Sequence, residues 1–443
     1  MRRLLMSCLL ALCCAPSCKQ AHREDEPQAS VPTVSASVAT AAPPAKPSPR
    51  PPYNVLFILI DSLRADMPWT GYERPIAPWL TAFAKRATLY PRAYSLSSYT
   101  AKSVVPALVG KYPSEMKRDG YFFTKWYDDN LLVTERAQQA GHRTLSGQGH
   151  GYFLPSLGVN QGFDEYRLLP GTFLDVKGVA DITSDRLNAL AKEMLGDPKN
   201  TSLGDKRFFA YFHFLDPHYT YIRHPEHPDF GNGRRDLYDN EVHFTDKWVG
   251  DLVDFALGQP WGKDTAVIIS ADHGEGFGER GQYRHAYELW ESLIRVPLFI
   301  YVPGAEPRRI EVPRGHIDLA PTIAELMGLR PEPAFRGQSL VGEVFGAEAA
   351  PRPVIADLPR CDLMDRRRAM VVGDSKLVAF GDDKSFMLFD VARDPKEERD
   401  LSAEQPEKLA EMKALYAKLS ADIPIEPVVG GVPLKGVHPS QRH

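Results

Sequence analysis

What the sequence lacks excludes several classes of protein. The chain has 443 residues, and beyond its first 18 residues it contains a single cysteine, Cys361. An exported chain with one cysteine in its body has no internal disulfide. The formal net charge of -4, without a dense stripe of lysine and arginine, argues against a nucleic-acid-binding protein. Residues 53–443 contain no apolar run long enough for a transmembrane helix.

The N-terminus has the parts of an export signal. Met1, Arg2 and Arg3 form a charged start, and an apolar stretch too short to span a bilayer follows. The remaining four cysteines lie within residues 8–18, which end in "CCAPSC". This ending resembles a bacterial lipoprotein signal, in which one cysteine carries the lipid, and an ordinary secretory signal is the alternative. We expect an exported protein, periplasmic or at the cell surface, held to a membrane by an N-terminal lipid anchor.

Composition divides the chain into five segments. Residues 1–18 are the expected signal peptide, and the Pro-, Ala- and Ser-rich residues 19–52 are a predicted disordered linker. Residues 53–350 form the expected main domain, and residues 351–422 a smaller C-terminal subdomain after the break at "GAEAAPRP". Residues 423–443 are expected to be a flexible tail.

Several apolar segments of the body end in an aspartate. The first such segment runs into Asp61, the second into Asp216, and the third into Asp272 and His273. Continuous apolar runs predict strands that are buried on both faces, and helical patterns lie between them. This alternation predicts an α/β fold with a mostly parallel sheet flanked by helices, in which ligands bind beyond the carboxyl ends of the strands.

Aspartates at one sheet edge favour a cation site. One aspartate after a strand is usually a turn former or a helix cap, but three are harder to explain in that way. Two of them are accompanied by histidine, His218 and His273, and Asp and His side chains suit a divalent cation. A cation would make a nearby hydroxyl a usable nucleophile. The candidate is Thr100 in "SSYTAKSVVPALVGKYP", a stretch that taken alone indicates only a helix cap.

Over residues 53–419 the chain resembles the sulfatase and alkaline phosphatase superfamily. "FILIDSLRAD" resembles the first metal strand of that family, and "TAKSVVPALVGKYP" aligns without gaps with the sulfatase signature. Resemblances continue in the same order in "NQGFDEY", "FLDPHYTY", "SADHGEGFGERGQYRHAYELWESLIRVPLFI", "HIDLAPTIAELMGL" and "FMLFDVARDPKEERDL". The resemblance implies the sulfatase-like α/β fold with a small C-terminal α+β subdomain.

The resemblance also implies a metal centre. It places one divalent metal ion, calcium, manganese or zinc, on Asp61, Asp272 and His273, with Thr100 as a fourth contact. Thr100 then takes the position of the catalytic nucleophile. A second metal ion at Asp216 and His285 is the alternative, and the Asp-Pro-His spacing favours one ion.

Further residues are implied to contact the substrate. His218 and His285 fall near family positions that hold the ester anion or protonate the leaving oxygen. Lys102, Asp216 and His150 are expected to bind substrate, with His150 taking the place of a Gly-Lys motif that this chain lacks. An ordinary loop histidine at His285 and a solvent-facing lysine at Lys102 are the alternatives.

Departures from the family pattern point to the chemistry. Because the nucleophile position is Thr100, a formylglycine cannot form there, and Val104, Lys102 and Ser62 replace other signature residues. A sulfated threonine lacks the elimination route of a formylglycine, whereas a phosphorylated threonine can be hydrolysed in line. The phosphoester is therefore favoured over the sulfate ester. Ser98 is a second candidate nucleophile, ranked lower because it puts the following glycine out of register.

These points predict a metal-dependent hydrolase that cleaves a sulfate or phosphate ester. The expected partner is an anionic ester, with a glycan or a lipid head group as candidates for the rest of the substrate. Two alternatives remain: a phosphoethanolamine- or phosphoglycerol-type transferase, whose relatives usually carry several transmembrane helices, and a binding lipoprotein without turnover. Arg64 and Asp66 are expected to form a structural pair beneath the first loop.

Overall fold

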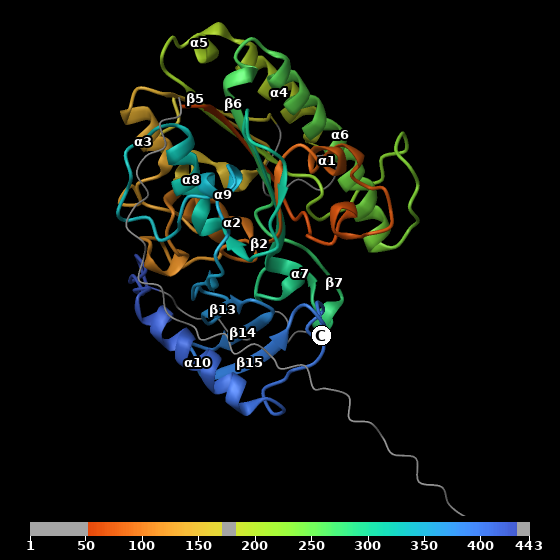
Figure 1. The fold of residues 1–443 in the computed structure, drawn as a ribbon, viewed down its shortest axis with the longest axis vertical. Coiled ribbons are helices and arrows are strands. Elements are labelled where there is room, and N and C mark those ends of the chain that lie inside the picture. Colours follow the sequence, from red (N-terminus) through yellow and green to blue (C-terminus); the bar gives the residue numbers. More distant parts are fainter. Residues whose placement is uncertain (1–51, 171–182, 432–443) are drawn as a thin grey trace, which may run out of the picture. The chain divides into compact units, whose positions relative to one another are not determined.

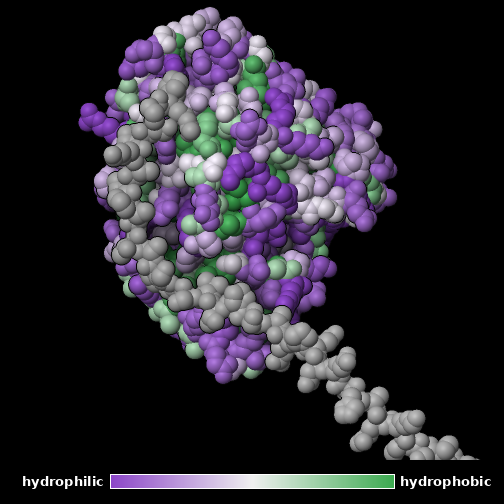
Figure 2. All heavy atoms as spheres, in the orientation of Figure 1, coloured by the Kyte–Doolittle hydropathy of each residue, from purple (hydrophilic) through white to green (hydrophobic). Residues whose placement is uncertain are grey.

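The computed structural model describes residues 52–170 and 183–431 (Figure 1). The predicted signal peptide, nearly all of the predicted linker and most of the predicted tail lie outside these residues. Within the described ranges no helix is both long enough and apolar enough to cross a membrane. On the face shown in Figure 2, hydrophilic residues cover most of the surface, with small apolar areas between them.

A nine-stranded sheet forms the centre of the larger part of the fold. All its neighbouring strands pair in parallel except β9, which is antiparallel to both β2 and β6. The mostly parallel sheet confirms the predicted fold class. In spatial order the strands are β10 (Arg308–Arg309), β2 (Thr88–Tyr94), β9 (Arg295–Tyr301), β6 (Thr265–Ser270), β1 (Asn54–Ile60), β5 (Phe208–Phe214), β3 (Arg143–Gln148) and β4 (Glu165–Leu168), with β11 (Arg314–Gly315) also beside β2.

The register of the central strands brings their carboxyl ends to one edge. Strand β1 is buried along its whole length, as its apolar run predicts for a strand covered on both faces. Ile60 of β1 lies opposite Phe214 of β5, and Leu59 lies opposite Ser270 of β6. The residues that follow these strand ends are therefore neighbours in space although they are far apart in the chain.

Helices cover both faces of the sheet (Figure 1). One layer holds α2 (Thr100–Val109), α3 (Val133–Gln139), α8 (Leu319–Leu326) and α9 (Val341–Val344), and the other holds α1 (Pro78–Phe83), α4 (Ser184–Gly196), α5 (Pro198–Thr201) and α6 (Arg234–Gly258). Helix α2 ends at Gly110, whose φ of 72° is the left-handed conformation common after a helix end. Single 3-10 turns are η1 (Pro68–Thr70), η2 (Pro113–Glu115), η3 (Gly151–Phe153), η4 (Pro155–Leu157), η5 (Gly262–Asp264), η6 (Glu279–Gly281) and η7 (His316–Asp318).

The predicted C-terminal α+β subdomain is present and is built on a second, antiparallel sheet. Its strands are β12 (Val354–Leu358), β13 (Arg367–Val372), β14 (Ser375–Phe380) and β15 (Ser385–Asp390). Helix α10 (Pro406–Ala421) packs Met412 and Tyr416 into one apolar cluster of this sheet. A second cluster joins the sheet to Leu289 and Trp290, beside the short helix α7 (Glu291–Ile294) and the hairpin of β7 (Gly276–Phe277) and β8 (Tyr283–Arg284).

His316 is a buried histidine that packs against the central sheet. Its Nε2 lies 2.8 Å from Ser270 Oγ, and the Ser270 hydroxyl donates to the carbonyl of Pro297 at 2.5 Å. Because the Ser270 hydroxyl already donates to Pro297, it accepts in its contact with His316, and His316 Nε2 carries the proton. Burial lowers the pKa of His316 to about 3, so the ring is neutral in the folded protein.

We predict that His316 contributes to a loss of stability in acid. As the pH falls from about 6.5 towards 3, His316 binds a proton in the unfolded chain but not in the folded protein. His316→Gln keeps an N–H donor but does not titrate. When the pH is lowered from about 7.5 to about 5, the free energy of unfolding of this variant should therefore fall by about 2 kcal/mol less than that of the wild type. Urea unfolding at both pH values measures the two losses, and equal losses would contradict the assignment.

Candidate active site

Two strand ends, one strand and one helix start converge at the edge of the sheet. Asp61 directly follows β1, Asp272 lies just beyond β6, and His213 is the next-to-last residue of β5. Thr100 is the first residue of α2. The sequence predicted the convergence of Asp61, Asp272 and Thr100, and the structure brings all three together.

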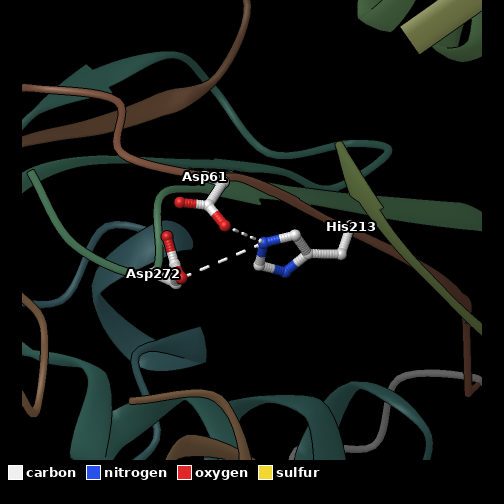
Figure 3. A group of neighbouring side chains, drawn as sticks. All are labelled: Asp61, His213 and Asp272. Atoms are coloured by element: carbon white, nitrogen blue, oxygen red, sulfur yellow. Dashed lines mark hydrogen bonds and ion pairs between the residues drawn. The ribbon is translucent and has the colours of Figure 1, made fainter. Parts of the chain in front are cut away.

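Asp61, Asp272 and His213 form the buried centre of the site (Figure 3). His213 Nε2 lies 3.2 Å from Asp61 Oδ2 and 3.9 Å from Asp272 Oδ2. The other ring nitrogen, Nδ1, lies 2.8 Å from the hydroxyl oxygen of Tyr211. This second contact fixes the ring so that Nε2 faces the two carboxylates.

Thr100 and His273 adjoin this centre. Thr100 Oγ1 lies 3.3 Å from Asp61 Oδ2 and 3.3 Å from His273 Nε2. His273 Nε2 also lies 3.3 Å from Asp272 Oδ2, while its Nδ1 lies 2.9 Å from the carbonyl oxygen of Gly274. A carbonyl oxygen only accepts, so Nδ1 carries the proton and Nε2 is left to face the site.

The charges of this centre suit a bound cation. Burial opposes the ionisation of Asp61, but His218, His213 and His273 together hold the pKa of its carboxyl well below the usual range. Asp272 Oδ2 is buried and has no hydrogen-bond partner among the described residues. Buried carboxylates are normally paired or bound to a metal, so this orphaned oxygen fits a metal ligand.

The donor atoms are also close enough to share one ion. The ligand atoms of Asp61, His213 and Asp272 all lie within 4.8 Å of one another, with His273 and Thr100 beside them. The metal roles of Asp61, Thr100, Asp272 and His273 stay predictions. Sequence reasoning missed His213, and its signal was one polar residue within the aromatic run "FFAYFHF".

Ser62 orients both carboxylates. Its hydroxyl donates to Asp61 Oδ1 at 2.9 Å, and its backbone N–H donates to Asp272 Oδ1 at 3.2 Å. Ser62 has a φ of 59°, a left-handed conformation that is uncommon for residues other than glycine. The turn after β1 is therefore shaped to place a donor between the carboxylates.

Three other histidines continue the site from His273. Ring centroids are 4.3 Å apart for His273 and His285, 4.9 Å for His285 and His218, and 6.1 Å for His218 and His150. His150 Nδ1 accepts from the backbone N–H of Tyr152 at 3.2 Å. Burial, with His218 nearby, lowers the pKa of His150 to about 4. The predicted catalytic and substrate-binding histidines thus lie together, and their roles stay predictions.

Glu275 positions His285, and sequence reasoning missed it although it lies within the quoted "ADHGEG". Its side chain is fully buried; His285 Nδ1 lies 3.2 Å from Glu275 Oε1, and Tyr221 donates its hydroxyl to Oε2 at 2.9 Å. Burial opposes the ionisation of Glu275, but the nearby His285 and other donors lower its pKa overall. An ionised carboxylate only accepts, so His285 donates from Nδ1 and keeps Nε2 free for a substrate.

Lys102 is directed into the protein. Its ammonium group contacts the Thr124 hydroxyl and lies 5.6 Å from the centroid of the Trp126 ring. Burial, with the Arg118 charge nearby, lowers the pKa of Lys102 to about 7. These contacts do not include Thr100, so the predicted role of Lys102 in binding the ester anion gains no support from them and stays a prediction.

Asp216 holds the start of α4. Its Oδ2 accepts hydrogen bonds from the backbone N–H and hydroxyl groups of Thr183 and Ser184, at 2.6 to 3.3 Å. Burial, with Glu241 nearby, raises the pKa of Asp216 to about 7. The contacts describe a helix cap. Substrate binding by Asp216, or a second metal ion shared with His285, stays a prediction.

The predicted pair of Arg64 and Asp66 is confirmed. Arg64 Nε lies 2.6 Å from Asp66 Oδ1. Arg64 Nη1 also lies 2.9 Å from Glu279 Oε1 and donates to the carbonyl of Glu275 at 2.5 Å. The pair thereby links the loop after β1 to the loop that carries Glu275.

Comparisons with known proteins agree with this architecture. The sulfatase family model matches residues 53–329. A choline-sulfatase of Rhizobium meliloti is 26% identical over 446 residues, which cover 82% of this chain and 85% of the relative.

Solved structures share the fold. A crystal structure of Ps i-CgsB in complex with k-i-k-neocarrahexaose has a TM-score of 0.69 at 20% identity, covering 86% of this chain and 95% of that one. A phosphonate monoester hydrolase from Silicibacter pomeroyi has a TM-score of 0.66 at 21% identity, covering 84% and 96%.

We predict that a divalent cation stabilises the folded protein through Asp272. When the ion concentration is a hundred times its Kd, binding adds about 2.7 kcal/mol to the free energy of unfolding, which raises the Tm by about 5 °C. Asp272→Asn should abolish this rise. Thermal unfolding with chelator or with added manganese, zinc or calcium measures it. Asp374→Asn, which changes a surface carboxylate 2.8 Å from Arg92, is the matched control and should keep the rise. An undiminished rise in Asp272→Asn would refute the site.

Proposed function

Because the chain belongs to the sulfatase family, we propose that Thr100 is the nucleophile of a metal-dependent ester hydrolase that favours phosphoesters over sulfate esters. The observation that carries the proposal is the position of the Thr100 hydroxyl, 3.3 Å from both Asp61 and His273 at a buried centre with an orphaned carboxylate oxygen. A threonine that only capped a helix would not need this surrounding.

The start of α2 favours negative charge on Thr100. As the first residue of a ten-residue helix, Thr100 lies at the positive end of the helix dipole. The same end of the helix favours an anionic ester beside the hydroxyl. When the hydroxyl gives up its proton, Asp61 Oδ2 is an acceptor 3.3 Å away.

The donor set fits manganese or zinc better than calcium. Asp61 and Asp272 offer oxygen, while His213 and His273 offer imidazole nitrogen. Calcium takes oxygen ligands, whereas imidazole is typical of zinc and other transition metals. A cation held by these residues would lower the pKa of the Thr100 hydroxyl and offset the charge of the ester.

The histidines can serve the leaving alcohol. A bond forms from Thr100 Oγ1 to phosphorus, the bond from phosphorus to the alcohol oxygen breaks, and that oxygen needs a proton. His285 can give it from Nε2, because Glu275 holds Nδ1 and stabilises the charged ring. Water then attacks the phosphorus of the covalent intermediate, the proton of that water passes to His285 Nε2, and the bond from phosphorus to Thr100 Oγ1 breaks.

The preference for phosphorus follows from threonine chemistry. A threonine ester has no aldehyde-derived hydroxyl, so the elimination that frees a formylglycine is closed to it. Attack of water at the transferred group remains, and phosphoryl transfer needs mainly positioning and charge neutralisation. The fold of a phosphonate monoester hydrolase supports this preference, whereas the sequence similarity to a choline-sulfatase supports sulfate.

We predict that Thr100→Ala lowers turnover of the preferred ester by about three orders of magnitude or more, because no covalent intermediate can form. Thr100→Ser keeps a hydroxyl and should retain part of the activity. Release of nitrophenol from matched sulfate, phosphate, phosphodiester and phosphonate esters measures this, with manganese, zinc or calcium added. A phosphoryl group on the peptide that contains Thr100 should appear in quenched wild type. Full turnover by Thr100→Ala would overturn the nucleophile.

We predict that His285, rather than His218, protonates the leaving oxygen. An alcohol of high pKa leaves poorly without a proton, whereas nitrophenol leaves as an anion. His285→Ala should therefore lose much more activity on an alkyl ester than on the nitrophenyl ester of the same acid, by about a hundredfold or more. Glu275→Gln should show a smaller loss of the same kind. Equal losses on both esters for His285→Ala, with the selective loss in His218→Ala, would reverse the assignment.

A further inference from the structure

Aromatic rings form a closed series beside the histidines of the site. From His218 the ring contacts continue through His150 to Tyr152, at 6.1 and 4.7 Å between centroids. Tyr152 contacts Phe123 at 4.9 Å, and Phe123 contacts Phe122 at 5.2 Å.

The series returns to the loop from which it started. Phe122 lies 5.6 Å from Tyr287, which is two residues after His285. Phe122 also stacks on Tyr99 at 4.4 Å and 6°, directly before Thr100. We call the rings from His285 through Phe123 to Tyr287 the aromatic series. One end of the series is the proposed acid His285, and the other end is Tyr287, two residues further along the chain. Phe122, within the series, stacks on Tyr99, the residue before the proposed nucleophile.

Exposed apolar side chains lie close in the chain to members of the aromatic series. Among the described residues the exposed large hydrophobic side chains are few, and Phe123 of the aromatic series is one of them, with 45% of its surface exposed. Tyr121 lies on the same loop, and Tyr283 lies two residues before His285. Exposed apolar groups that cluster next to a polar site mark a binding surface more often than scattered ones do.

Arg284 adds a positive charge to this surface. Its guanidinium carbon lies 3.5 Å from the centroid of the Tyr219 ring, next to His218 in the chain. Arg284 is exposed and makes no ion pair with a carboxylate in the part of the chain that the structure describes. Burial raises the pKa of Tyr287, and the charge of Arg284 works against that rise, so the guanidinium acts on the aromatic series as well.

The backbone holds Arg284 in a strained conformation. Arg284, Ala286 and Tyr287 have φ values of 64°, 70° and 63°, all left-handed and none at glycine. The backbone N–H of Ala286 donates to the carbonyl of Ser98 at 2.8 Å, which ties the strained loop to the segment between β2 and Thr100. Such strain persists where the surrounding structure enforces it, and it is most common at functional sites.

We propose that the aromatic series and Arg284 bind the alcohol part of the substrate, and that they select a ring-bearing alcohol with a second negative charge. The inference rests on the proposed ester hydrolysis. Aromatic faces stack on flat rings and on the apolar faces of sugars, while an unpaired guanidinium binds a carboxylate or a second ester anion.

The proposal separates this chain from the choline-sulfatase to which it is similar. A cationic alcohol would have to lie beside Arg284, and like charges brought together at a binding surface are unfavourable. The shared chemistry of the expected alcohols is an anionic ring. An acidic sugar and a phenolic acid are the two sources that an experiment has to distinguish.

Matched esters test the second charge. We would compare 4-carboxyphenyl and 4-carbamoylphenyl esters of the acid that the protein hydrolyses, because the two leaving groups differ mainly in charge. The wild type should prefer the carboxylate by about tenfold in kcat/KM, the value of one charge-assisted hydrogen bond. Arg284→Ala should erase the preference, so that kcat/KM becomes equal for the two esters. Arg234→Ala is the control, since Arg234 stacks on Tyr283 at 4.9 Å and should keep the preference.

Two further experiments test the preference for a ring-bearing alcohol and distinguish an acidic sugar from a phenolic acid. Phe123→Ala should lower kcat/KM for both aryl esters but not for a methyl ester, and the choline ester should be the poorest substrate. Glucuronate and galactose esters, set beside the aryl pair, show whether the sugar or the phenolic acid is preferred. A carboxylate preference that survives Arg284→Ala, or a choline ester hydrolysed as fast as the aryl esters, would overturn the proposal.

Binding without turnover separates the two hypotheses. If no ester is hydrolysed, the proposed function fails, and calorimetric titration with 4-hydroxybenzoate and glucuronate still tests the alcohol site in the full chain. Binding of either anion that Arg284→Ala abolishes and Arg234→Ala keeps would support the alcohol site alone. The absence of binding, or equal binding by all three proteins, would refute it.

Discussion

The burial of Asp61 and Asp272 next to each other is the constraint on which the site depends. Two carboxylates at 1% and 0% exposure repel each other and lose their hydration, so the fold needs positive charge or strong donors between them. Ser62 supplies one donor to each, and His213 and His273 turn a ring nitrogen towards them. Asp272 Oδ2 is still without a hydrogen-bond partner among the described residues. A bound cation would offset the negative charge of the two carboxylates. The same cation would then lower the pKa of the Thr100 hydroxyl.

The sequence could predict the residues whose place follows from topology alone. Asp61 and Asp272 follow apolar strands, and parallel strands end at a common edge, so their meeting needs no knowledge of packing. His213 follows the same topology but is inside its strand, where a lone histidine usually belongs to the core. Glu275 becomes recognisable only when the loop after β6 folds back and brings His285 to it.

Lys102 and Asp216 show the limit of reasoning from position. Both are close in sequence to proposed active-site residues, yet side-chain direction depends on which partners the tertiary structure offers. Lys102 follows Thr100 by two residues on a helix, a spacing that puts the two side chains on different faces, and it turns to Thr124 and Trp126. Asp216 accepts from the start of α4, a segment more than 30 residues away in the chain that no local pattern connects to it.

The C-terminal sheet explains how the strained loop of His285 keeps its shape. Lys376 of β14 lies 2.9 Å from Glu397 and 3.3 Å from Glu291, the first residue of α7. Glu397 in turn accepts from the backbone N–H of Glu291 at 2.6 Å. Removing one partner of such a buried ion pair leaves an uncompensated charge, so each of the three residues depends on the other two for its stability. The chain from the left-handed Arg284 to α7 is short, so the C-terminal part fixes the far end of the loop that presents the proposed acid and the proposed anion-binding arginine. The smaller sheet thereby supports the proposed active site through the loop that it holds.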